Sequence, residues 1–155
     1  MNRLIASTGL LQRAIAPKKS RSLVHPIRLL ATTGTGNPKP PVPDADTIFD
    51  KIIRKQIPAD IIYEDDKCLA FNDVSPQGPV HFLLIPKRRI PKLEDGTPAD
   101  MELFGYLMLM AGQLGQQKAP QGFRLVVNNG EHGCQSVFHL HLHVIGGRQL
   151  GWPPG

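Results

Sequence analysis

The sequence predicts an α+β domain built on a mostly antiparallel sheet. Two observations predict it. Several short runs alternate apolar and polar residues or are continuously apolar, which is typical of β-strands. One longer run repeats apolar residues every three or four positions, as an amphipathic helix does. The elements follow one another as helix, three strands, helix and two strands, an order that fits an α+β domain.

The first half of the domain carries a short helix and three strands. Asp46 or Thr47 can cap a helix that reaches about Lys55, because both side chains accept hydrogen bonds from free amides of a first helical turn. Strands are expected at residues 61–63, 68–71 and 80–85. The segment between the last two, 73–79, contains two prolines and is expected to be a stiff loop.

The second half carries the longer helix and two further strands. Thr97 is a capping residue, Pro98 stands at the first helical position, and Asp100 follows at the third. The helix that begins there is expected to turn one apolar stripe to the core, made of Met101, Phe104, Leu107, Met108, Ala111 and Leu114. The last two strands are expected at residues 123–128 and 137–145.

Charge divides the 155 residues into a leader and a domain. Residues 1–43 contain seven basic residues and no acidic one, whereas residues 44–155 carry a net charge of −2. An acid-free, Arg-containing leader with scattered Ser and Thr predicts a mitochondrial targeting peptide, with the matrix as destination; a basic tail that stays attached is the alternative. Residues 32–43, rich in Gly, Thr and Pro, predict a flexible linker to a domain at 44–155.

The same composition excludes other classes of protein. The domain offers no basic field for nucleic acid, and the sequence has no apolar run long enough to span a bilayer. Its two cysteines, Cys68 and Cys134, form no CxxC pair and no zinc framework. Cys68 is expected in the core, and Cys134 is expected to be exposed in a glycine-containing loop without a catalytic role.

Three histidines stand at alternate positions in the last expected strand. His139, His141 and His143 are interleaved with Phe138, Leu140, Leu142 and Val144. Side chains alternate across a strand, so the apolar set is expected to be buried and the imidazoles to line the opposite face. Imidazoles are poor core material, which indicates chemistry or ligand binding on that face.

The histidines alone leave two functions open. Two imidazoles that are two residues apart can share a zinc ion, and His81 could complete such a site. The alternative is phosphate chemistry, because a neutral imidazole is a good nucleophile and a second one can bind phosphate oxygens. The neighbouring segment favours phosphate: the glycine-containing turn 128–134 offers backbone amides to an anion, and Ser136 adds a hydroxyl.

Four separated segments resemble the histidine triad (HIT) superfamily, and within it the nucleotide-binding branch that hydrolyses nucleoside phosphoramidates. They are residues 49–55, 69–77, 81–87 and 136–155, so that the resemblance covers about residues 46–155. With its basic leader, the chain is most similar to the mitochondrial form of that branch. The resemblance implies a HIT-like fold whose sheet continues across a homodimer, and chemistry without a cofactor or metal. The ending GGRQ…WPPG makes a diadenosine polyphosphate hydrolase less fitting.

The resemblance also implies roles for individual residues. His141 is the expected nucleophile, and it forms a covalent nucleotidyl intermediate. His143 is expected to bind phosphate oxygens, Ser136 to pass a proton to the leaving amine, and His139 and His81 to complete the polar shell. Asp73 is expected to bind the ribose. The residues expected to contact the base are Ile48, Phe49, Ile52, Phe71 and Val74, and those expected at ribose or phosphate are Asn128, Cys134 and Gln135.

The substrates implied are adenosine or guanosine 5′-phosphoramidates, with aminoacyl-adenylates as further candidates. Two other functions stay open: a nucleotide-binding regulatory protein whose hydrolysis is incidental, and a nucleotidyl transferase. There are two departures from the family pattern: the first is expected to alter the phosphate turn or make the site sensitive to oxidation, and the second to affect substrate selectivity. Cys134 replaces a glycine in the phosphate turn, and Gly151 stands where relatives carry a larger or polar residue.

Overall fold

The computed structural model describes residues 45–154. The predicted targeting peptide and linker at residues 1–43 lie outside the described residues, so they remain a prediction. Within residues 45–154, none of the helices has the length and apolar character needed to cross a bilayer.

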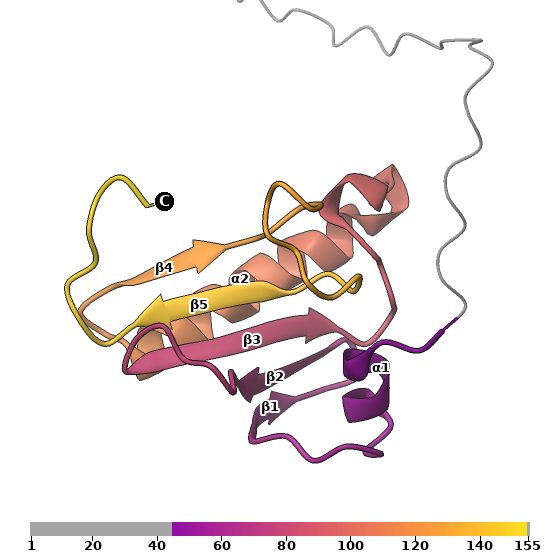
Figure 1. Cartoon of the computed structure of the whole chain (residues 1–155), viewed down its shortest axis with the longest axis horizontal. Coiled ribbons are helices and arrows are strands. Elements are labelled where there is room, and N and C mark those ends of the chain that lie inside the picture. The colour runs from indigo at the N-terminus through magenta and orange to yellow at the C-terminus, as the bar shows by residue number, and fades with distance from the viewer. Residues whose placement is uncertain (1–44, 155) are drawn as a thin grey trace, which may run out of the picture. The chain divides into compact units, whose positions relative to one another are not determined.

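Five antiparallel strands form one sheet in the order β1-β2-β3-β5-β4 (Figure 1). Each neighbouring pair is antiparallel. The prediction of an α+β domain with two helices and an antiparallel five-stranded sheet is therefore confirmed. The strands are β1 (Ile61–Glu64), β2 (Cys68–Asn72), β3 (Val80–Pro86), β4 (Phe123–Val126) and β5 (Leu142–Gly146).

The short helix α1 (Ile48–Ile53) begins with a capping box. The side chain of Thr47 accepts a hydrogen bond from the amide of Asp50 at 3.1 Å, and the carboxylate of Asp50 accepts one from the amide of Thr47 at 2.7 Å. Both exchanges satisfy amides that the first helical turn leaves free. The helix buries Phe49 and Ile52 in a cluster with Leu69, Phe71, Leu83 and Ile85.

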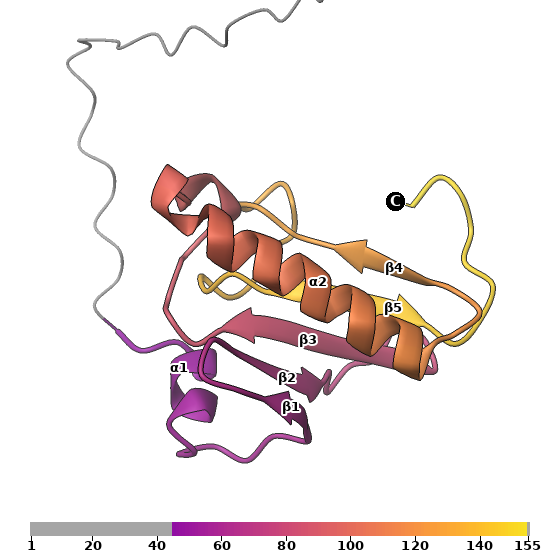
Figure 2. The same cartoon turned by 180° about the vertical axis from the view of Figure 1, so that it is seen from behind.

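The long helix α2 (Met101–Lys118) covers the other face of the sheet (Figure 2). It follows two 3-10 turns, Leu93–Asp95 and Pro98–Asp100, so the helix begins three residues later than Pro98. The buried stripe contains Leu107, Met110, Ala111, Leu114 and Gly115.

The predicted stripe of α2 was wrong for two methionines. Met101 is 72% exposed and Met108 is 55% exposed. The two are seven residues apart and therefore share a face, which lies about 100° from Leu107 around the helix. Met110 takes the buried place instead.

The predicted strand at 137–145 was also wrong in its first half, because β5 begins only at Leu142. On one side, β4 ends at Val126, opposite His143, so the earlier residues have no partner there. On the other side, β3 ends in Pro86, which has no amide to donate, and its carbonyl faces the ring of His139 at 2.8 Å. Residues 137–141 are therefore held by individual contacts and not by the regular hydrogen bonds of a β-sheet.

Strand β3 separates the two faces of the sheet residue by residue. Phe82 and Leu84 belong to the cluster under α2, whereas Leu83 and Ile85 belong to the cluster under α1. This alternation follows from the two-residue period of a strand. His81 has the parity of Leu83, and the histidine site accordingly forms on the α1 face.

Candidate active site

The three histidines lie on the α1 face of the sheet. Leu140, Leu142 and Val144 are buried in the cluster under α2, as the alternation predicted. Phe138 does not join them, because it precedes the regular part of the chain and is 42% exposed. The imidazoles instead meet Phe49 of α1, whose ring centre lies 5.3 Å from that of His141 and 5.9 Å from that of His139.

His141 is held with one nitrogen bound and the other free. Its Nδ1 lies 2.7 Å from the carbonyl oxygen of His139, and since a carbonyl only accepts, Nδ1 carries the proton. In the neutral ring the lone pair is then on Nε2. Nε2 has no hydrogen-bond partner within residues 45–154. It is also not one of the fully buried polar atoms that lack a partner in this range, so it is accessible to solvent. Burial lowers the pKa of His141, which favours the neutral, nucleophilic ring.

His143 is the end of a hydrogen-bonded chain that starts at a backbone amide. The amide of Gln77 donates to Nδ1 of His81 at 3.0 Å, so the proton of the neutral His81 ring is on Nε2. That nitrogen lies 3.0 Å from Nδ1 of His143 and donates to it. The proton of His143 is consequently on Nε2, which is buried and has no acceptor within the described part of the chain.

The hydrogen bonds from Gln77 through His81 to His143 also decide whether this part of the site can bind a metal. Asp73, His81 and His143 each present a ligand atom, and these atoms lie within 4.8 Å of one another. The spacing suits zinc, but a ligand nitrogen needs a free lone pair. Nε2 of His81 carries a proton because Nδ1 is occupied by the amide of Gln77. The donor set therefore fits a hydrogen-bond relay better than the zinc site considered above.

Burial keeps the site histidines neutral. It lowers the pKa of His139 and His141, and together with the charges of His141 and His81 it lowers the pKa of His143 to about 4. The nearby carboxylate of Asp73 opposes this effect only in part.

The lowered pKa values predict that acid destabilises the protein well above the range in which carboxylates titrate. Between pH 6.5 and about 4, the unfolded chain binds protons that folded His143 does not, so the free energy of unfolding decreases as the pH falls. His143 alone contributes roughly 3 kcal/mol over that window, at about 1.4 kcal/mol per pKa unit. Urea unfolding at pH 7.5 and pH 5.0 measures the decrease. His143→Gln should shrink it and exposed His132→Gln should not; equal midpoints at both pH values would contradict the prediction.

The loop between β4 and β5 is closed by its own hydrogen bonds. The amides of Gly133 and Gln135 donate to the carbonyl of Gly130, and that of Cys134 donates to the carbonyl of Glu131. These amides are therefore not free to face an anion, contrary to the prediction for the turn. The side chain of Gln135 is buried and fully used: it accepts from the amide of Gly130 and donates to the carbonyls of Pro91 and Val137. Gln135 therefore stabilises the conformation of the loop.

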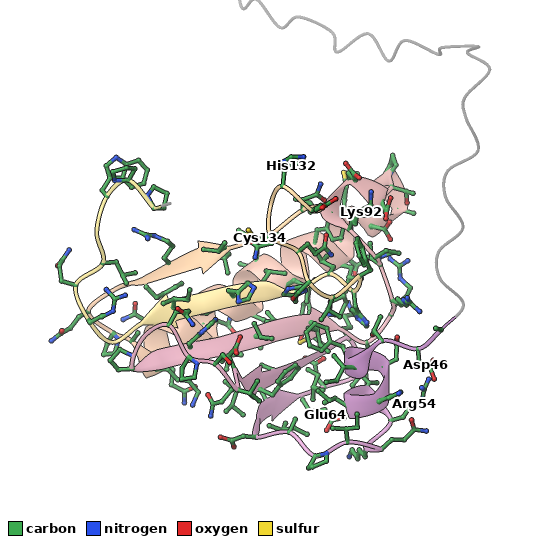
Figure 3. All side chains as sticks on the ribbon, in the orientation of Figure 1. Asp46, Arg54, Glu64, Lys92, His132 and Cys134 are labelled. Atoms are coloured by element: carbon green, nitrogen blue, oxygen red, sulfur yellow. The ribbon has the colours of Figure 1, made fainter. Side chains whose placement is uncertain are left out.

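Cys134 holds this loop in a left-handed conformation with a φ of +58°. Its side chain is exposed, as predicted (Figure 3). We expect Cys134→Gly to raise the free energy of unfolding by about 0.5–1 kcal/mol, because glycine adopts this φ without the clash of a Cβ. Lys55, also at φ +58°, provides the matched variant Lys55→Gly, distant in sequence from the histidines. Denaturant midpoints measure both; a loss of stability in Cys134→Gly alone would show that the side chain is needed.

The residues predicted to bind the base divide into buried and exposed ones. Phe49, Ile52 and Phe71 are buried, and the rings of Phe49 and Phe71 lie edge to face at 5.6 Å. Ile48 is half exposed and Val74 is 99% exposed, so neither is a plain core residue. Phe49, Ile52 and Phe71 belong to one apolar cluster, and Phe49 brings that cluster against His141.

Asp73 and Ser136 lie on two sides of this surface. Asp73 accepts a hydrogen bond from the amide of Ser75 at 2.8 Å, and its second oxygen lies 3.4 Å from Nε2 of His81. Asn128 is half-buried in the segment after β4. Ser136 lines a pocket of about 260 Å³ together with Ala45, Thr47, Ile48, Arg89, Val137 and Phe138.

Two charged residues beside the site were missed by the sequence interpretation. Asp50 lies with one oxygen 3.5 Å from Nδ1 of His139, and Arg89 lies 3.6 Å from the other oxygen. His139 itself is 0% exposed, so its ring is enclosed behind His141 and not at the surface of the site. The Thr-x-x-Asp spacing of the capping box marks Asp50 as helix-capping, but no local pattern connects it to a residue 89 positions later.

The comparisons with known proteins agree with this fold. A family model described as the HIT domain matches residues 54–150. An uncharacterised HIT-like protein of Synechocystis is 58% identical over 111 residues, which cover 71% of this chain and 97% of the relative. The structure of a HIT family hydrolase from Legionella pneumophila superposes with a TM-score of 0.69 at 43% identity, covering 71% of this chain and all of the other.

The protein belongs to the HIT family. A further relative shows the branch: a protein named adenylylsulfatase HINT1, from Arabidopsis thaliana, is 51% identical over 115 residues, which cover 72% of this chain and 78% of the relative. The chain is therefore a member of the HINT-like branch, as the sequence motifs predicted.

Proposed function

We propose that the protein hydrolyses the P–N bond of adenosine and guanosine 5′-phosphoramidates, releasing the nucleoside monophosphate and an amine. The observation that carries this proposal is the geometry of His141. The carbonyl of His139 fixes the proton on Nδ1, and the lone pair of the neutral ring is left on the accessible Nε2. A nucleophile held in this way needs no separate base to activate it.

In the first step, Nε2 of His141 bonds to the α-phosphorus while the P–N bond of the substrate breaks. The electron pair of that bond leaves with the amine, which takes up a proton, and Ser136 is the residue proposed to pass it. The product is a nucleotidyl-histidine with a positive charge on the imidazole. The proton on Nδ1 stays in its hydrogen bond to the carbonyl of His139.

His143 stabilises the negative charge on the phosphate oxygens in this step. The relay from Gln77 through His81 leaves its proton on Nε2, so His143 donates to an oxygen without first having to be charged. Its lowered pKa keeps it in that neutral form at physiological pH. In the second step, water bonds to phosphorus and releases one proton to solvent, while the bond to His141 breaks. The electron pair of that bond returns to Nε2, so the ring is neutral again, with its proton still on Nδ1, when the monophosphate leaves.

The remaining site residues hold the nucleoside. The apolar surface of Phe49, Ile52 and Phe71, with the exposed Ile48 and Val74 at its rim, suits the face of a purine base. We assign Asp73 to the ribose hydroxyls and Asn128 to ribose or phosphate. Gln135 and Cys134 contribute by shaping the loop that carries Ser136.

Mass spectrometry after a brief quench with adenosine 5′-phosphoramidate tests this proposal. We expect an added adenylyl mass on the peptide that contains His141, and its absence in His141→Ala. His132→Ala is the matched control, because His132 is exposed on the loop between β4 and β5 (Figure 3). Turnover by the parent chain with no adduct on His141 at any quench time would overturn the covalent mechanism.

Other substrates and roles are tested with the same protein. Adenylylsulfate is a second candidate because the Arabidopsis relative is named an adenylylsulfatase, and aminoacyl-adenylates are a third; relative kcat/KM values rank them. Negligible turnover on all three, with nucleotide binding intact, would favour a regulatory protein. Transfer of the nucleotidyl group to added phosphate or sugar phosphate in preference to water would favour a transferase.

We also propose that the protein acts as a homodimer. Along α2, Met101, Met108 and Leu109 are exposed, and a Cβ added to Gly105 or Gly112 would meet nothing within 4 Å. Strand β4 is the last strand of the sheet, next to β5, and its outer edge has no partner strand among the described residues. An exposed apolar helix face beside an open strand edge supports pairing with a second copy. Light scattering should give twice the chain mass, and Leu109→Lys should give the monomer; a monomeric parent chain would refute the proposal.

The basic leader supports a mitochondrial location, with the matrix as the proposed compartment. Expression of the full chain and of a chain lacking residues 1–43, each with a C-terminal fluorescent protein, tests this. Only the full chain should enter mitochondria. Import of both, or of neither, would refute the targeting role.

A further inference from the structure

A buried charged cluster lies behind the nucleophile and has no part in the steps described above. His139 is completely buried, and its Nδ1 lies 3.5 Å from an oxygen of Asp50 on α1. The other oxygen of Asp50 lies 3.6 Å from the guanidinium of Arg89, which follows β3. The side chain of Asp50 is itself only 13% exposed. A cluster of this kind costs free energy to bury unless its members compensate one another.

The hydrogen bonds of His139 define what Asp50 can do. Nε2 of His139 lies 2.8 Å from the carbonyl of Pro86 and therefore carries a proton. Nδ1 is buried and has no hydrogen-bond partner in the described residues, and it faces the carboxylate. In a neutral His139 ring, the lone pair of Nδ1 would face an oxygen of the Asp50 carboxylate, and both are acceptors. Protonation of His139 on Nδ1 removes the conflict, so Nδ1, beside Asp50, is the nitrogen that takes up a proton as the pH falls.

Asp50 is kept ionised for this contact. Burial alone would raise its pKa, but the two hydrogen bonds from Thr47, with the charges of His139 and Arg89, outweigh it and hold the pKa below its usual value. Both bonds from Thr47 go to the same oxygen, at 2.7 Å each. The second oxygen is left for His139.

His139 connects this charge to the nucleophile, because its carbonyl accepts the proton of Nδ1 of His141. We propose that Asp50 is a positioning residue for His141. Through His139 it fixes the carbonyl that orients the nucleophile, and its negative charge stabilises the positive charge that His141 gains when it bonds to phosphorus. This inference deepens the proposed function and rests on it.

The groups that face His139 come from three elements. Asp50 on α1 favours the protonated ring, Arg89 after β3 disfavours it, and His141 on the same segment also disfavours it. Burial opposes protonation most strongly. Asp50 is the carboxylate in contact with His139, so removing its charge should change the titration of the pair more than any other single change.

The chain contains its own control for this test. Asp100 occupies the same position as Asp50 in a second Thr-x-x-Asp capping box, accepts from the amide and hydroxyl of Thr97, and is paired with Arg88. Its side chain is 7% exposed, against 13% for that of Asp50, and its partners are Thr97 and Arg88 and not a histidine. Asp50→Asn and Asp100→Asn therefore remove the same capping and ion-pair contacts, and only the first removes a charge from His139.

We expect Asp50→Asn to lower kcat on adenosine 5′-phosphoramidate about tenfold with KM nearly unchanged, because the change removes the charge that faces His139 and, through the carbonyl of His139, supports the imidazolium formed on His141. The acid limb of the pH profile should move to lower pH, since loss of a negative charge disfavours the protonated imidazole. Asp100→Asn should keep kcat and the profile of the parent, while both variants lose similar thermal stability.

Equal kcat values and equal pH profiles in the two variants would overturn the inference, and so would a drop in kcat without a shift of the profile. Nitrogen NMR of the histidine rings in the full chain, with and without Asp50→Asn, gives a second reading that does not need turnover. His139 should titrate at lower pH in the variant; an unchanged titration would again overturn it. If the parent chain shows no turnover and no adduct on His141, the proposed function fails, and the NMR titration still decides whether Asp50 and His139 are coupled.

Discussion

His141→Ala should lower kcat/KM for adenosine 5′-phosphoramidate by about three to four orders of magnitude, while the affinity for AMP changes by less than about fivefold. In the proposed mechanism, removal of the ring removes the atom that bonds to phosphorus, so the loss should fall on the chemical step. In the proposed site, base and ribose are held by other residues, among them Phe71 on β2 and Asp73 in the loop that follows it, so binding should survive.

Steady-state rates and calorimetric titration with AMP measure the two quantities. His132→Ala, on the same segment of the chain and also a histidine, should have the rate of the parent. More than a tenth of the parent rate in His141→Ala would contradict the assignment of the nucleophile. Loss of AMP binding together with turnover would indicate that the variant is misfolded, which far-UV circular dichroism distinguishes.

Leu84→Ala should lower the free energy of unfolding by about 3–4 kcal/mol, the usual cost of a cavity at a fully buried leucine. Leu84 has no exposed surface and lies in the central strand β3, between Ala70 of β2 and Leu142 of β5. Its side chain belongs to the cluster under α2, on the face opposite the histidines. The folded variant should therefore keep kcat within about threefold of the parent at low temperature.

The neighbouring variant Leu83→Ala separates stability from activity. Leu83 belongs to the cluster under α1 and pairs with His143 across the ladder. We expect it to lose stability as well, but also to lose kcat, because the cavity opens beside the relay. Urea unfolding and rate measurements on both variants test this. A cost below about 1 kcal/mol for Leu84→Ala would show that the sheet can close the cavity.

The sequence predicted the local features of the fold well, because their causes are local. The capping side chain of Thr47, the strand that ends in Pro86, and the alternation of Leu140, Leu142 and Val144 all depend on residues within one element. The HIT motifs then indicated the branch of the family, which the comparisons confirmed. The roles assigned to individual site residues remain predictions.

The features that sequence could not predict depend on contacts between distant segments. The first half of the expected last strand has no ladder, because β4 ends early and Pro86 uses its carbonyl for a side chain. The buried face of α2 depends on how the helix is rotated against the sheet, which decides between Met108 and Met110. The contact of Asp50 with His139 joins α1 to the other end of the chain.

The relay to His143 begins at the main chain and not at a side chain, and this has a consequence for variation at position 77. The amide of Gln77 holds its proton throughout the physiological pH range, so the direction of every later hydrogen bond in the relay is constant. Nineteen of the twenty common amino acids supply the same donor, and mutational scans should find position 77 tolerant. Proline alone lacks the hydrogen and would leave His81 free to reverse its tautomer.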